Sequence, residues 1–179
     1  VAALMETIGS GAVTAPFSEA LNSDVLLVIG ANPAENHPVA ATFFKNAVDN
    51  GTALIVVDPR GQVLKNHCKH MVCNKPGTDV ALLNAIMHVV IKEGMYDHEF
   101  VAQRTEGFVE LREHLKRFSP DSVAAQCGIS ADQIVACARA FGNAKNAMIF
   151  WGMGISQHIH GTDNVRCLIA LALLTGQIG

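Results

Sequence analysis

The 179-residue sequence contains few aromatic and few charged residues, although half of its residues are hydrophobic. Only 6% of the residues are aromatic, so the core is expected to be aliphatic. The 13 basic and 16 acidic residues give a net charge of −3, which excludes a generally basic nucleic-acid-binding protein. No uncharged apolar run reaches the ~18 residues of a membrane helix, so this chain is not expected to contact a membrane.

The five cysteines are too scattered for a metal cage, and their odd number argues against a disulfide framework. None of them forms a Cys-x-x-Cys pair. Cys137 and Cys167 lie in apolar helical patterns and are expected to be buried as small hydrophobic residues. This cysteine usage predicts a reducing, cytoplasmic location.

Short motifs of common catalytic sites are also absent. The sequence has no Gly-x-Gly-x-x-Gly fingerprint, Walker phosphate loop, Gly-x-Ser-x-Gly motif or His-Glu-x-x-His motif. The eight histidines have no metal-like arrangement with carboxylates. None of these common catalytic or metal-binding motifs therefore marks the chain.

Continuous aliphatic segments at 25–30 and 53–58 are typical of strands buried on both faces of a parallel sheet. Shorter strands are predicted at 70–73 and 147–151. Helical spacing of apolar residues predicts the helices 38–50, 79–93, 97–104, 107–118, 121–127, one starting after Ser130, and 162–175. This alternation predicts a doubly wound, Rossmann-like α/β fold with a mainly parallel sheet and helices on both faces.

The whole chain, residues 1–179, is expected to form one α/β domain, because no linker, repeat or low-complexity segment interrupts it. The sequence begins with Val1 and stops at Gly179, directly after a predicted helix. These ends lead us to expect a domain of a longer polypeptide.

Four polar turns follow the predicted strands, at the edge where open α/β sheets bind ligands. The first turn, residues 30–38, begins at Gly30 and carries the polar side chains Asn32, Glu35, Asn36 and His37. It leads into a helix whose free N–H groups favour an anionic phosphate. The alternative is a tight turn whose polar side chains cap helices.

The second turn is Val57-Asp58-Pro59-Arg60. An acidic residue after the second strand holds ribose hydroxyls in dinucleotide-binding folds, and Arg60 can contact phosphate or stack on a base. Asp-Pro also opens ordinary turns. Residues 58–77 carry four basic side chains against one acidic one, which indicates either an anionic ligand or a solvated basic face.

The third turn, residues 75–79, precedes a long predicted helix. Gly77 permits a close approach, while Thr78 and Asp79 either cap the helix or bind polar edges of a ligand. In the fourth turn, residues 151–157, two glycines bring the backbone close to another group, and Gln157 can recognise an amide-like edge. These turns indicate ligand binding, whereas no feature indicates chemistry.

Together these turns resemble the molybdopterin oxidoreductase family, specifically the catalytic subunit of formate dehydrogenases. The string Gly-Ala-Asn-Pro-Ala-Glu-Asn-His-Pro in the first turn and Val-Asp-Pro-Arg in the second are part of this likeness. The matching segments follow one another over nearly the whole chain: 27–39, 57–60, 77–85, 100–108, 151–157 and 173–179.

The resemblance implies that this domain holds one of two molybdopterin guanine dinucleotides, which carry molybdenum or tungsten. It implies a phosphate–ribose region lined by Gly30, Asn32, Glu35, Asn36 and His37. It implies a guanosine slot formed by Val57, Asp58, Pro59 and Arg60, with further nucleotide contacts from Gly77, Thr78 and Asp79. By the same resemblance, the residues that lie towards the pterin are Gly152, Met153, Gly154 and Gln157.

In this family, the Cys or selenocysteine that ligates molybdenum, its neighbouring His, a substrate-orienting Arg and the four-Cys motif of a 4Fe-4S cluster lie outside the matched segments. None of the five cysteines here matches these roles, so the resemblance implies a domain with no catalytic residue and no metal ligand, which is inactive alone. Its partners would be the rest of the catalytic subunit, electron-transfer subunits and formate, which the whole enzyme oxidises to CO2. Two alternatives stay open: the same domain of a nitrate reductase, and a non-catalytic Rossmann-like module such as the central domain of thiamine-diphosphate enzymes.

Overall fold

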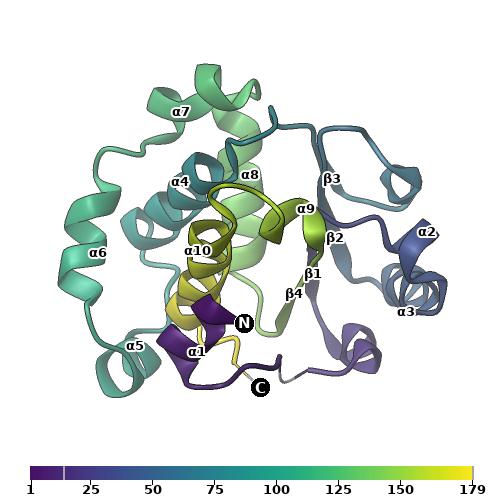
Figure 1. The fold of residues 1–179 in the computed structure, drawn as a ribbon, viewed down its shortest axis with the longest axis horizontal. Helices are drawn as coiled ribbons and strands as arrows, with labels where there is room; N and C mark the ends of the chain where they lie inside the picture. Colours follow the sequence, from purple (N-terminus) through teal and green to yellow (C-terminus); the bar gives the residue numbers. More distant parts are fainter. Residues whose placement is uncertain (14, 179) are drawn as a thin grey trace.

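The computed structural model describes residues 1–13 and 15–178. Its four strands form one parallel sheet in the order β3-β2-β1-β4 (Figure 1). The strands are β1 (Val25–Ile29), β2 (Ala53–Val57), β3 (His70–Val72) and β4 (Ala147–Trp151). Every residue of β1 is buried, which confirms the double-sided burial predicted from its unbroken aliphatic sequence.

Helices connect the strands and cover both faces of the sheet. The bounds are α1 (Ala2–Ile8), η1 (Phe17–Asn22), α2 (Pro33–Asn36), α3 (Pro38–Asp49), η2 (Val63–Asn66), α4 (Asp79–Lys92), α5 (His98–Arg104), α6 (Phe108–Leu115), α7 (Pro120–Cys127), α8 (Ala131–Gly142), α9 (Met153–Ser156) and α10 (Gly161–Leu174). The predicted strands and longer helices are confirmed, and their ends move by three residues at most. The helices α1, η1, α2, η2 and α9, each of seven residues or fewer, were not predicted.

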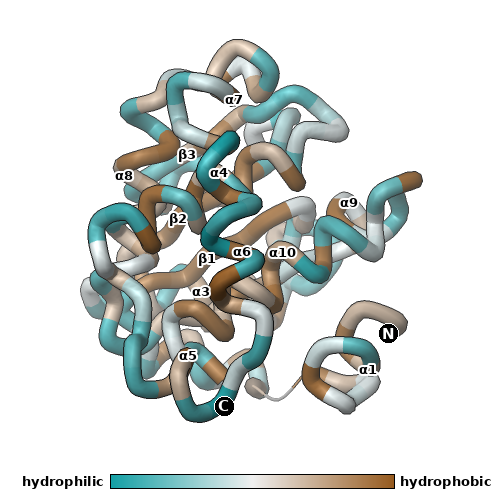
Figure 2. Tube along the Cα trace, turned by 90° about the vertical axis from the view of Figure 1, so that its left-hand side faces the viewer, coloured by the Kyte–Doolittle hydropathy of each residue, from teal (hydrophilic) through white to brown (hydrophobic). Residues whose placement is uncertain are grey.

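Alternate residues of the central strands enter two separate cores. Leu26 and Val28 of β1 pack with Phe44 of α3 on one face. Leu27 and Ile29 belong to the larger core on the other face, which includes residues of α4, α8 and α10. Figure 2 shows hydrophobic segments concentrated at the sheet and hydrophilic ones around the periphery. Two cores on one parallel sheet confirm the doubly wound α/β fold.

Helix α4 lies in the middle of the larger core, between other helices. Most of its residues are buried, and His88 on it pairs through Nδ1 with the carbonyl oxygen of Leu115 at 2.9 Å. Within the described part of the chain, no helix has the length and hydropathy needed to span a membrane.

The cysteines only partly follow the prediction. Cys137 is buried as expected, whereas Cys167 is half-buried. Burial raises the pKa of both thiols to about 12. The two side chains therefore stay in the thiol form at neutral pH.

Candidate functional site

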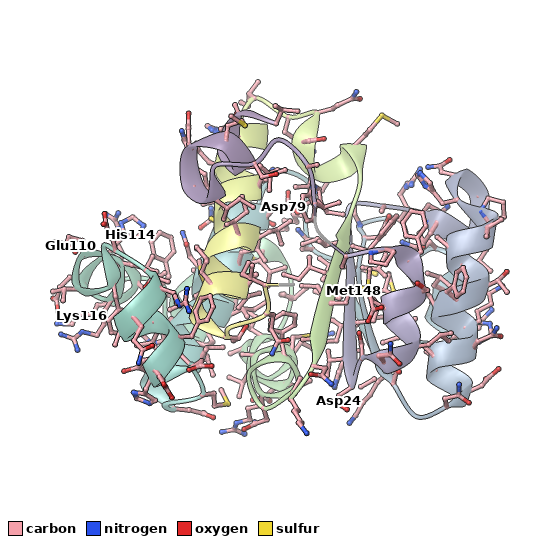
Figure 3. The ribbon with its side chains drawn as sticks, turned by 90° about the horizontal axis from the view of Figure 1, so that it is seen from below. Asp24, Asp79, Glu110, His114, Lys116 and Met148 are labelled. Carbon is pink, nitrogen blue, oxygen red and sulfur yellow. The ribbon has the colours of Figure 1, made fainter. Side chains whose placement is uncertain are left out.

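The four polar turns lie together at the carboxyl edge of the sheet, because all four strands are parallel. Main-chain hydrogen bonds connect the first two turns to the ends of the neighbouring strands. Gly30 N–H donates to the carbonyl of Val57 at 3.1 Å, and Asp58 N–H donates to that of Val72 at 3.1 Å. Figure 3 places Asp79, from the third turn, at the opposite end of the sheet from Asp24, which precedes β1.

The first and fourth turns touch through their glycines. Gly154 N–H donates to the carbonyl of Gly30 at 2.9 Å. A Cβ on Gly154 would lie 2.6 Å from that carbonyl oxygen, and a Cβ on Gly30 would lie 2.7 Å from the nitrogen of Ile155. The close approach predicted from Gly152 and Gly154 is therefore an approach to the first turn. A ligand contact of these glycines stays a prediction.

Gly77 in the third turn is different. Its φ is +81°, and a Cβ placed on it would meet nothing within 4 Å. The left-handed backbone explains the glycine, and the space beside it is open to a ligand.

The polar side chains of the first turn do not cap its helices. Asn32 and His37 occupy the N-cap positions of α2 and α3, and neither side chain accepts a helical N–H. The capping alternative is therefore wrong for these two residues. Pro33 instead begins α2 within this turn, because proline suits the first position of a helix.

The polar residues of the first turn differ in their solvent exposure. Asn32 is 7% exposed, and its Oδ1 has no hydrogen-bond partner among residues 1–13 and 15–178. Glu35, Asn36 and His37 are exposed. The ring of His37 packs against Phe150, with 5.8 Å between ring centroids. One amide thus points into the protein while three polar side chains face outward.

The second turn buries its carboxylate and exposes its guanidinium. Asp58 is 3% exposed, and its Oδ1 accepts a hydrogen bond from the N–H of Arg60 at 2.8 Å. Nε of Arg60 lies 3.6 Å from the same oxygen, yet the Arg60 side chain is 73% exposed. The guanidinium can therefore contact a phosphate or a base without leaving Asp58. Val57 is buried beneath it and Pro59 is exposed.

Thr78 and Asp79 are buried in a polar cluster of the third turn. Thr78 is the N-cap of α4, but its hydroxyl donates to the carbonyl of Lys75 at 2.6 Å and caps no helical N–H. Nδ2 of Asn74 donates to the Thr78 hydroxyl at 3.2 Å and to Oδ1 of Asp79 at 3.3 Å. The side-chain cap expected from Thr78 is absent because the turn itself binds its hydroxyl.

In the fourth turn, Met153 and Gln157 are exposed at the two ends of α9. Met153 begins this short helix and Gln157 is its C-cap. The predicted irregular turn is thus partly helical. Both side chains are accessible, as their predicted contact with a ligand requires.

Two buried amides at this edge of the sheet, Gln62 and Asn74, were not predicted from the sequence. Gln62 is 6% exposed and donates through Nε2 to the carbonyl of Ala31, while Asn74 is 2% exposed. Their side-chain oxygens, like Oδ1 of Asn32, have no partner in the described residues. No local pattern marks these two residues, because glutamine and asparagine are usually exposed.

The three unpartnered oxygens lie just beyond the carboxyl ends of β1, β2 and β3. Leaving a buried acceptor without a donor costs about 1–3 kcal/mol, so such groups normally meet water or a ligand. Hydroxyl and N–H groups of a nucleoside would supply the missing donors. This set of acceptors therefore fits the nucleoside part of a dinucleotide.

The basic residues near these turns lie at the surface. Lys65, Lys69 and Lys75 are exposed, as expected for either a phosphate-binding or a solvated basic face. Nζ of Lys75 donates to the carbonyl of Ala125 at 3.2 Å. Burial, with a smaller contribution from Lys69, lowers the pKa of His70 below its usual 6.5. In the described residues, no group of His, Cys, Asp and Glu side chains could hold a metal ion.

Comparison with known proteins finds that the family model "Molybdopterin oxidoreductase" matches residues 3–179. The chain is 43% identical over its whole length to formate dehydrogenase H of Escherichia coli strain K12, and covers 25% of that protein. It is 32% identical to the assimilatory nitrate reductase catalytic subunit of Bacillus subtilis strain 168, over 93% of this chain and 24% of the relative. The chain thus spans about a quarter of these relatives' length.

Among solved structures, acetylene hydratase from Pelobacter acetylenicus is similar in fold, with a TM-score of 0.83. The two are 30% identical, and the match covers 87% of this chain and 22% of the hydratase. The segment 173–179, which resembles the family in sequence, includes Gly179, and this residue lies outside the described residues.

Proposed function

The chain belongs to the molybdopterin oxidoreductase family, and we propose that residues 1–179 are the domain that holds one molybdopterin guanine dinucleotide in the catalytic subunit of a formate dehydrogenase. The observation that carries this proposal is the row of buried polar groups along one edge of the sheet, with three acceptors lacking donors. The higher identity to a formate dehydrogenase than to a nitrate reductase supports formate as the substrate.

The second turn would hold the guanosine. The buried Asp58 carboxylate would accept hydrogen bonds from N–H or hydroxyl groups, and the exposed Arg60 guanidinium would stack on the base or pair with phosphate. Val57 and Pro59 would border the slot. In the third turn, Gly77 leaves the backbone accessible beside Thr78 and Asp79.

The first turn would line the phosphate–ribose region, with Gly30 fixing its shape and Asn32, Glu35, Asn36 and His37 supplying polar groups. The fourth turn would face the pterin through Met153 and Gln157, with Gly152 and Gly154 packed on the first turn. When bound, the cofactor would supply two-electron chemistry at molybdenum or tungsten. The part of this chain is to bind and orient it.

The other steps of the proposed reaction need groups outside this chain. The metal ligand and a 4Fe-4S cluster would belong to the rest of the catalytic subunit, and electron-transfer subunits would accept the electrons. This domain would be inactive alone. We also propose a cytoplasmic location, from the unpaired cysteines.

The test is Asp58→Ala in the complete catalytic subunit, with Asp49→Ala on the exposed end of α3 as the matched control. Bound molybdenum or tungsten and the GMP released by acid hydrolysis are measured per polypeptide. We expect at least a tenfold lower cofactor content in Asp58→Ala, because charge-assisted hydrogen bonds contribute about 1.5–3 kcal/mol each. Equal content in wild type and both variants would contradict the assignment.

Nitrate is the second candidate substrate, because the matched domain of a nitrate reductase is 32% identical. Assays of the complete subunit with formate plus an electron acceptor, and with nitrate plus an electron donor, separate the two. Formate oxidation without nitrate reduction is the expected result. Family membership removes the support for a non-catalytic module related to thiamine-diphosphate enzymes.

A further inference from the structure

Gln62 lies in the connection from β2 to β3, four residues after Asp58, and serves as the N-cap of η2. The residue is 6% exposed, and Nε2 of its side chain donates to the carbonyl of Ala31 in the first turn. Gln62 therefore joins two turns of the candidate site through one carboxamide.

The Ala31 carbonyl fixes which way the carboxamide points. Exchanging its oxygen and nitrogen would place Oε1 against another acceptor, so Nε2 must face Ala31. Oε1 then faces away from Ala31, and no group of the described residues donates to it. Oε1 of Gln62 is therefore a buried acceptor of fixed orientation that lacks a donor in the described residues.

The polar groups near Gln62 indicate which kind of ligand group could donate to Oε1. Oδ1 of Asn32 is also a buried acceptor without a partner, and Asp58 adds a buried carboxylate on the adjacent strand end. As hydrogen-bond acceptors, these groups pair with N–H and hydroxyl groups rather than with phosphate oxygens, which are acceptors themselves. A guanosine offers such donors at N1, the 2-amino group and the ribose.

We propose that Gln62 is a positioning residue of the nucleotide site: Nε2 holds the Ala31 carbonyl, and Oε1 accepts a hydrogen bond from an N–H or O–H group of the bound guanosine. This inference rests on the proposed function. It adds a specificity-determining acceptor that lies outside the four turn motifs.

Gln62→Met tests this role because methionine has a similar volume and shape without either polar group. In the empty protein the substitution removes the bond to Ala31 but also removes an unsatisfied acceptor, so stability should change little. In the loaded protein it removes a ligand contact. A residue with a purely structural role would instead destabilise both forms equally.

The experiment uses the complete catalytic subunit as wild type, as Gln62→Met and as Gln103→Met, an exposed glutamine on α5 that serves as the matched control. Two quantities are measured: GMP released by acid hydrolysis after extended dialysis, and the melting temperature of the loaded and cofactor-free proteins. Gln62→Met should lose the nucleotide three- to tenfold faster than the control, the range of one neutral hydrogen bond. Its loaded and cofactor-free melting temperatures should lie closer together than in wild type.

Three results would overturn the inference. Nucleotide loss equal to that of wild type would mean that an ordered water supplies the donor, and an equal drop of both melting temperatures would mean a structural role only. If wild type releases no GMP, the proposed function itself fails, and the inference fails with it. Gln62→Asn, whose carboxamide is one methylene too short to reach both groups, provides the same comparison should the methionine variant not fold.

Discussion

Replacing Gly30 by alanine should break the contact between the first and fourth turns. Gly30 has a φ of +56°, and a new Cβ would lie 2.7 Å from the nitrogen of Ile155 and 2.8 Å from the carbonyl carbon of Gly154. The left-handed conformation costs an alanine about 1–2 kcal/mol. Forcing backbone apart adds about 1–3 kcal/mol, the usual cost of overpacking. We expect Gly30→Ala to lower the free energy of unfolding by about 2–5 kcal/mol.

Two further variants separate these contributions. Gly94 has a similar φ of +69°, but a Cβ there would meet nothing within 4 Å, so Gly94→Ala should lose only the conformational part, about 1–2 kcal/mol. Gly154 lies outside the left-handed region, and its Cβ would lie 2.6 Å from the Gly30 carbonyl oxygen. Gly154→Ala should therefore lose only the packing part, about 1–3 kcal/mol.

Urea unfolding of the four proteins, followed by far-UV circular dichroism, measures these differences if the denaturant slope stays constant. We expect Gly30→Ala to be less stable than Gly94→Ala by the packing contribution, about 1–3 kcal/mol. Equal stabilities of Gly30→Ala and Gly94→Ala would refute it, because the first and fourth turns would then be free to separate. In that case the contact between the two turns would not explain why Gly30 and Gly154 are glycines.

Three further predictions concern side chains away from these glycines. Iodoacetamide should label the exposed Cys73 in the native protein and leave Cys137 unmodified until unfolding, because burial raises the pKa of the Cys137 thiol to about 12. Mass spectrometry of peptides measures the labelling of each cysteine. Equal labelling rates of Cys73 and Cys137 in the native protein would contradict this prediction. Burial lowers the pKa of His70 in the native protein, so on acidification the unfolded state binds a proton at this residue before the native state does. The contribution of the neutral His70 to the free energy of unfolding is therefore fully present above pH 6.5 and is lost as the pH falls through the native pKa. His70→Gln should thus lose less stability than wild type on acidification below pH 6.5, measured by urea unfolding. Ser130→Ala should lower the free energy of unfolding by about 1 kcal/mol, because Ser130 and Gln133 form a capping box at the start of α8. Ser156→Ala, at an exposed serine, serves as the control and should not lower it. Equal urea midpoints of the two variants would count against the cap.

The sheet could be predicted from the sequence because its strands have a strong and local signal. The aliphatic run at 25–30 has no polar position, and only a strand covered on both faces suits it. Parallel strands then bring their carboxyl ends to one edge, so the polar turns after them had to lie side by side. The location of the candidate site therefore followed from the fold class.

The partners of individual side chains could not be predicted in the same way. Glycines at 152 and 154 indicate that the backbone approaches something closely, but the group approached is Gly30, more than a hundred residues earlier. Thr78 before a helix indicates a side-chain cap, yet the nearer Lys75 carbonyl takes its hydroxyl. The partner of the glycines is distant in sequence, and the partner of the Thr78 hydroxyl depends on the conformation of the turn, so the residue types alone identify neither.

Burial of Gln62 and Asn74 depended on the turns rather than on the residue types. Gly61, with a φ of +67°, precedes Gln62, and the chain then directs the carboxamide against Ala31 of the first turn. Glutamine in a Gly-Gln sequence would otherwise be assigned to solvent. The protein keeps these amides buried with oxygens unpaired, at a cost in stability that a packed apolar side chain would avoid. A ligand that supplied the missing donors would recover that cost on binding, so in the proposed site these oxygens would favour the loaded form of the domain over the empty one.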